Sequence, residues 1–91
     1  MARGIGKVNQ DSADYRQALH RSLQRGCKET DILLGKFAEA ELKNFSNNSL
    51  ALYSQFIQED DVYIYDWILA KAEIKDKYKD LIFLIRDFHN L

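Results

Sequence analysis

Apolar side chains recur every three or four positions along most of this chain, which is the spacing that places them on one face of an α-helix. The pattern predicts five helices, each with one apolar stripe. The stripes consist of Ala18, Leu19 and Leu23; Leu33, Leu34, Phe37, Ala38 and Leu42; Leu50, Tyr53, Phe56 and Ile57; Ile64, Trp67 and Ile68; and Ile74, Tyr78, Leu81, Ile82, Ile85 and Phe88. In the fourth stretch, Trp67 is expected in the core and Tyr63 at the surface.

Polar clusters and glycines separate these stretches and predict where the chain turns. The first helix is expected to begin near Asp14. Gly26 is expected to end it in the left-handed conformation, which glycine adopts at little cost. The second helix should span about 28–43, and the third should follow the cap cluster at 46–49. The acidic run 59–61 should end the third helix and cap the fourth.

The composition favours an all-helical fold. The 91 residues include no proline and only four glycines, so the chain lacks the residues that separate short strands. Gly35 falls inside the second predicted helix, where another helix is expected to pass closely. We therefore predict a flexible N-terminal arm over residues 1–13 and a single domain over 14–91. Its fold class is all-α, a small antiparallel bundle of about five helices.

Charge narrows the class of partner. Thirteen basic and fourteen acidic residues give a net charge of −1, so nothing global attracts the chain to nucleic acid or anionic lipid. Residues 1–36 carry seven Lys or Arg against four acids, whereas residues 37–66 carry one lysine against six. This polarity suits oriented docking on another protein. No segment approaches the roughly 20 apolar residues of a membrane span, so we expect no direct membrane insertion.

Few residues offer catalytic chemistry. The only nucleophile with a candidate base is Cys27, with His20 seven positions earlier, and a lone cysteine beside a helix cap is more often a packing residue. One cysteine and two separated histidines do not form a metal-binding cluster. The chain is therefore predicted not to be an enzyme and to bind no metal.

The interhelical turn (residues 25–29, Arg-Gly-Cys-Lys-Glu) gathers the most distinctive polar groups. One interpretation is a glycine cap followed by a capping glutamate. The other is a docking epitope, because a rigid scaffold would present a glycine whose backbone a partner can approach closely. Exposure separates the two: open Arg25, Gly26 and Glu29 favour docking, and internal bonding of these residues favours the cap.

This turn and its surroundings resemble a known family. Residues 21–38, RSLQRGCKETDILLGKFA, are similar to the core of the succinate dehydrogenase assembly factor, or flavinylation factor, family, whose motif is Arg-Gly-x-x-Glu. The acidic run 59–61 and the following Trp67 are similar to that family's acidic, tryptophan-containing segment. The resemblance covers roughly 15–71 and departs at 62–63, where Val-Tyr replaces the usual Pro-Asp.

The resemblance implies an assembly factor, or chaperone, built as a small helical bundle. Such a protein binds the flavoprotein subunit of succinate dehydrogenase, and in some bacteria of fumarate reductase. It promotes covalent attachment of FAD to a histidine of that subunit and need bind no cofactor stably itself. The implied location is the bacterial cytoplasm, or the mitochondrial matrix for a processed eukaryotic form. The alternative is a generic helical adaptor or regulator with no role in flavinylation.

The candidate partner-binding residues are Arg21, Arg25, Gly26, Lys28, Glu29, Asp31 and Asp61. In this hypothesis Gly26 permits close backbone contact, and Arg25 supplies a planar fork of donors. Glu29 either orients Arg25 or bonds to the partner. Asp31 supports the turn, and Asp61 caps the fourth helix.

Overall fold

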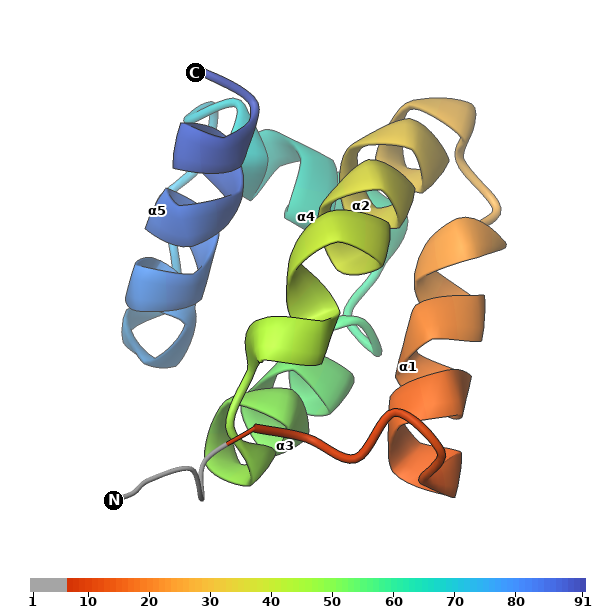
Figure 1. Ribbon diagram of the computed structural model, residues 1–91. Coiled ribbons are helices and arrows are strands. Elements are labelled where there is room, and N and C mark those ends of the chain that lie inside the picture. The colour runs from red at the N-terminus through yellow and green to blue at the C-terminus, as the bar shows by residue number, and fades with distance from the viewer. Residues whose placement is uncertain (1–6) are drawn as a thin grey trace.

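The computed structural model describes residues 7–91, and the chain folds there into five α-helices and two short 3₁₀ helices without a strand (Figure 1). The α-helices are α1 (Ala13–Leu23), α2 (Lys28–Glu41), α3 (Asn47–Phe56), α4 (Asp61–Ile68) and α5 (Lys79–Phe88), and the 3₁₀ helices are η1 (Leu42–Asn44) and η2 (Asp76–Tyr78). The predicted all-α fold is confirmed. None of these helices is long and apolar enough to cross a membrane.

Helix α2 lies at the centre of the arrangement. Helix α1 packs along one side of it and α5 along the other, as Figure 1 shows. Helix α4 also contacts α2, and α3 contacts α1. The interhelical turn joins the first two helices at one end of the bundle.

Two serine caps fix the starts of helices. Ser12 Oγ accepts the Tyr15 N–H at 3.1 Å, and Ser46 Oγ accepts the Ser49 N–H at the same distance. Each cap contributes about 1 kcal/mol, because it satisfies a donor that the first helical turn leaves unpaired. The predicted cap cluster at 46–49 therefore lies partly inside α3, with only Ser46 at the cap position.

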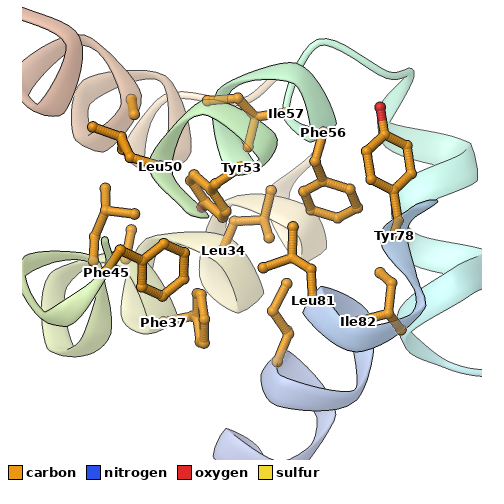
Figure 2. Packing of buried hydrophobic residues seen from close by; sticks show 14 of the residues in the cluster. Leu34, Phe37, Phe45, Leu50, Tyr53, Phe56, Ile57, Tyr78, Leu81 and Ile82 are labelled. Carbon is orange, nitrogen blue, oxygen red and sulfur yellow. The ribbon is translucent and has the colours of Figure 1, made fainter. Parts of the chain in front are cut away.

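Aromatic rings from several helices meet in the core (Figure 2). The Phe37 ring of α2 packs edge-on against Phe45 at 5.9 Å and against Phe88 of α5 at 5.7 Å between centroids. Burial of each large apolar side chain contributes about 1.5–3 kcal/mol. Trp67 is 4% exposed and Tyr63 is 54% exposed, so both expectations are confirmed.

Helices α1 and α2 approach closely at Gly35. A Cβ added there would lie 3.1 Å from Leu23 Cδ2 and 3.6 Å from the Ser22 backbone oxygen. This confirms the close approach predicted for that glycine. The buried Ser22 hydroxyl beside it donates to the Ala18 carbonyl at 2.9 Å and lies 2.5 Å from the Tyr53 hydroxyl of α3.

The N-terminal region differs from the prediction where the structure describes it. Residues 1–6 of the expected arm lie outside the described residues. Val8 is buried, and its N–H donates to the Phe45 carbonyl at 2.8 Å. The chain is thus packed on the bundle before α1 begins, because an apolar side chain so close to the core finds a place in it.

The last apolar stripe begins before the last helix does. Ile74 lies in the loop after α4, Tyr78 lies in η2, and α5 starts only at Lys79. Ala70, with a φ of 58°, redirects the chain at the end of α4. Periodicity alone would place Ile74 on the helix, but loop side chains can also fill the core.

Candidate functional site

The Arg25 side chain of the interhelical turn reaches across to α4 and the loop before it. Its Nε donates to Asp61 Oδ1 at 2.8 Å, and its terminal nitrogens donate to the backbone oxygens of Ile57 at 2.5 Å and Glu59 at 3.2 Å. Only 11% of the side chain is exposed. A guanidinium has five N–H donors, so two remain after these internal bonds are made.

Asp61 joins the interhelical turn to α4. Its Oδ1 accepts from Arg25, and its Oδ2 accepts the Cys27 N–H at 3.1 Å. Cys27 is the N-cap of α2, and Asp61 is the first residue of α4. The carboxylate therefore lies near the positive ends of two helix dipoles as well as beside a guanidinium, and all three stabilise its charge.

A second carboxylate holds the backbone of the turn. Asp31 Oδ1 accepts the Arg25 N–H. Helix α1 ends at Leu23, and the N–H of its C-cap residue Gln24 donates to the His20 carbonyl. No glycine within residues 7–91 has a positive φ. The prediction of a left-handed cap at Gly26 is wrong. A glycine cap at Gly26 would direct the Cys27 N–H back to a helix carbonyl, whereas here Asp61 accepts it.

The fold of the unbound protein does not require glycine at position 26. Gly26 is exposed, and an added Cβ would lie 3.6 Å from Asp61 Oδ2, which is an ordinary van der Waals contact. Its φ lies outside the left-handed region that favours glycine. Alanine would fit here, and the bare backbone is open to the close approach of another molecule.

Glu29 and Lys28 point into solvent from the start of α2. Glu29 Oε2 accepts from Cys27 Sγ at 3.2 Å, and this bond, followed by one to a backbone N–H, lowers the pKa of the Glu29 carboxyl. The carboxylate is therefore ionised at neutral pH. Of the two roles left open for Glu29, orienting Arg25 is wrong, because Asp61 makes that contact. Bonding to the partner stays a prediction.

An open cavity of about 480 Å³ adjoins the interhelical turn. The residues that line it are Arg21, Gln24, Arg25, Gly26, Ile57, Gln58, Glu59, Asp60 and Asp61. Arg21 is exposed and forms no ion pair with any residue from 7 to 91. The cavity thus presents an exposed guanidinium beside an acidic loop, a surface suited to a polar segment of a partner.

The seven candidate residues fall into two groups. An internally bonded group holds the turn and consists of Arg25, Asp31 and Asp61. An exposed group surrounds it and consists of Arg21, Gly26, Lys28 and Glu29. The exposure of Gly26 and Glu29 therefore favours the docking interpretation. The internal bonds of Arg25 favour a purely structural role for that side chain. Sequence reasoning missed Ile57 and Glu59, because both act on Arg25 through backbone oxygens, which no side-chain pattern reveals.

Comparison with known proteins adds a second line of evidence. The family described as flavinator of succinate dehydrogenase matches residues 16–89. A Dictyostelium discoideum protein named succinate dehydrogenase assembly factor 2, mitochondrial, is 29% identical over 87 residues, which cover 91% of this chain and 62% of that protein. A Candida glabrata protein of the same name is 36% identical over 91 residues, covering 92% and 59%. An Aspergillus flavus namesake is 39% identical over 73 residues, covering 79% and 25%.

This chain spans less than two thirds of the length of these relatives. The family match nevertheless covers most of the residues that the structure describes. It includes the interhelical turn, the loop before α4 and the α5 helix. The chain belongs to the family of flavinators of succinate dehydrogenase.

Proposed function

We propose that this protein is an assembly factor that binds the flavoprotein subunit of succinate dehydrogenase and promotes covalent attachment of FAD to it. The observation that carries the proposal is the interhelical turn, which is fixed from within while Gly26, Lys28 and Glu29 remain exposed. Membership of the flavinator family and the names of the relatives support it. Those names also favour a mitochondrial location, and in a bacterial source the same role would belong to the cytoplasm.

The proposed contribution is orientation rather than bond making. The flavin and the histidine that receives it both belong to the flavoprotein, and no bond-making step is assigned to this chain. Holding two reacting groups in the right geometry can lower a barrier by about 7–11 kcal/mol at most. The protein would act as a chaperone of this kind and hold no cofactor stably itself.

A rigid turn suits that task. Three internal bonds fix the Arg25 guanidinium, so little side-chain entropy is lost when its two remaining N–H groups meet a partner. Gly26 would allow the partner backbone to approach, and the ionised Glu29 would accept a hydrogen bond from it. Arg21 would pair with a carboxylate that enters the adjoining cavity.

The direct test is reconstitution of the flavoprotein subunit with FAD, with and without this protein. Covalent flavin is read after denaturation as fluorescence that stays with the flavoprotein band. We expect the signal to rise several-fold when the protein is present. An unchanged signal despite a soluble, FAD-loaded flavoprotein would overturn the proposal.

A second candidate function is a generic helical adaptor. The internal bonding of Arg25 favours it, because a turn that only stabilises the fold would have these same contacts without any flavin-related role. This candidate predicts that the protein binds partners with no gain in covalent flavin. The reconstitution therefore separates the two candidates by the flavin signal.

A further inference from the structure

The position of Arg25 depends on the loop between α3 and α4. Two of the three acceptors of its guanidinium are backbone oxygens of that loop, those of Ile57 and Glu59. The loop, residues 57–60, lies outside both helices, so helical hydrogen bonds do not fully fix it. Something else has to hold the loop if the interhelical turn is to be rigid.

The Glu59 side chain provides that support from the opposite end of the residue. Its Oε2 accepts from the Tyr78 hydroxyl at 3.2 Å and from Lys75 Nζ at 3.0 Å. One residue thus has its backbone oxygen on Arg25 and its carboxylate on the segment that leads into α5. Glu59 therefore links the interhelical turn to the segment before α5.

The Tyr78 side chain is held rigidly in the core. It is 0% exposed, and its ring lies 5.2 Å from Phe56 and 5.8 Å from Trp67 between centroids. In Figure 2 its hydroxyl points out of the group of buried side chains, away from the labelled core residues. A ring packed in this way holds its hydroxyl in one place, so the bonded carboxylate is held as well.

The bond from Lys75 restrains the Glu59 carboxylate less than the bond from Tyr78 does. The Lys75 side chain is 52% exposed, so solvent screens its ion pair with Glu59. The bond from Lys75 is the largest cause of the lowered pKa of the Glu59 carboxyl, which therefore stays ionised at neutral pH. The lysine maintains the charge, and the tyrosine fixes the position.

We infer that Glu59 is a positioning residue for the interhelical turn, through which Tyr78 and the start of α5 hold Arg25 in its docking orientation. The inference rests on the proposed function, because it deepens how the turn is prepared for the flavoprotein. It also gives a role to chain beyond residue 71, where the resemblance offers no motif. The C-terminal segment would then contribute to partner binding without touching the partner.

The first test uses the free protein and needs no partner. NMR measures how fast the Arg25 Nε–H exchanges with water, and its bond to Asp61 should keep that exchange slow in the wild type. We expect Glu59→Ala to speed the exchange about fivefold, as loss of roughly one hydrogen bond's worth of restraint would. Tyr78→Phe, which removes one hydroxyl and keeps the ring, should act in the same direction.

Two variants serve as controls. Glu59→Gln retains an oxygen that can accept from Tyr78, so it should preserve slow exchange. Ser46→Ala removes the α3 cap at the far end of that helix and lowers stability by a comparable amount, but it should leave the Arg25 exchange unchanged. Unchanged exchange in both Glu59→Ala and Tyr78→Phe, or equal acceleration by Ser46→Ala, would overturn the inference.

The second test measures binding of the same variants to the flavoprotein subunit by titration calorimetry. Glu59→Ala should weaken the affinity about fivefold, whereas Glu59→Gln and Ser46→Ala should stay close to the wild type. If the wild type itself does not bind, the proposed function fails, and the exchange rates still decide the role of Glu59. If the wild type binds and Glu59→Ala binds with the same affinity, the inference about Glu59 is overturned and the proposed function is not.

Discussion

Asp61 and Arg25 stand 36 positions apart in the chain, yet they form the 2.8 Å ion pair that joins α4 to the interhelical turn. The pair is largely shielded, with side chains 11% and 20% exposed. The same carboxylate holds the Cys27 N–H, so one side chain from α4 shapes both the start of α2 and the end of the loop after α1. The turn is therefore part of the tertiary structure and would not keep its shape as an isolated peptide.

Replacing Asp61 should be costly. Asp61→Ala removes an acceptor from the shielded guanidinium of Arg25 and leaves the Cys27 N–H without its partner. We expect the free energy of unfolding to fall by about 2–3 kcal/mol, measured by urea denaturation. Asp60→Ala is the matched control, because the neighbouring side chain makes no cap bond and should cost about 0.5 kcal/mol. Equal losses in the two variants would contradict this account of the turn.

Alanine at position 26 should be tolerated by the free protein. The added methyl group of Gly26→Ala meets Asp61 Oδ2 at 3.6 Å, and the backbone there has no positive φ. We expect the free energy of unfolding to stay within about 1 kcal/mol of the wild type, since the restricted unfolded chain offsets small adjustments. A larger loss in thermal or urea denaturation would show that the fold itself needs this glycine.

The exposed Glu29 should matter for binding and not for folding. Glu29→Gln removes a charge whose polar contacts, Cys27 Sγ and its own backbone N–H, lie within the turn. We expect the unfolding midpoint to remain unchanged and the affinity for the flavoprotein subunit to fall about tenfold, as for a lost charge-assisted bond. Glu39→Gln, on an exposed part of the same helix, is the control. Similar affinities for both variants would argue against a role of Glu29 in docking.

Tyr53 predicts an alkaline sensitivity. Burial raises the pKa of the Tyr53 hydroxyl from 10.0 to about 12, so the folded protein keeps a proton that the unfolded chain releases. The folded state is thus favoured fully below pH 10 and loses this advantage as the pH rises towards 12. Tyr53→Phe should cost about 1 kcal/mol at neutral pH and show a smaller loss over the alkaline range. The assignment would be refuted if urea denaturation showed the same loss of unfolding free energy with rising alkaline pH in both proteins.

The helices and their buried faces follow from local patterns. Apolar spacing located all five helices, and Gly35 marked the close approach of α1 because a bare backbone has little other use inside a helix. The cluster at 46–49 indicated the start of α3 because its cap, Ser46, acts on a donor three residues away. Each of these features depends on neighbours within about one helical turn, so the sequence contains the information directly.

The construction of the site depends on contacts over long sequence separations. The prediction of a left-handed cap at Gly26 was wrong because Asp61, which lies far along the chain, accepts the Cys27 N–H. The chain therefore needs no left-handed glycine to satisfy that donor. Arg25 could be singled out as a donor, but its acceptors include two backbone oxygens of the α3–α4 loop. Both oxygens lie more than 30 positions further along the chain, so residue types near the turn do not reveal them.

The central claim is that the interhelical turn acts on covalent flavin attachment, and Gly26→Arg tests it most directly. Flavin fluorescence retained by the denatured flavoprotein is compared for the wild type, Gly26→Ala and Gly26→Arg, after circular dichroism has shown that all three are folded. We predict that the arginine variant loses nearly all stimulation, because a long side chain occupies the exposed surface where the partner backbone would approach. A folded Gly26→Arg protein that supports flavin attachment as well as the wild type would contradict the account.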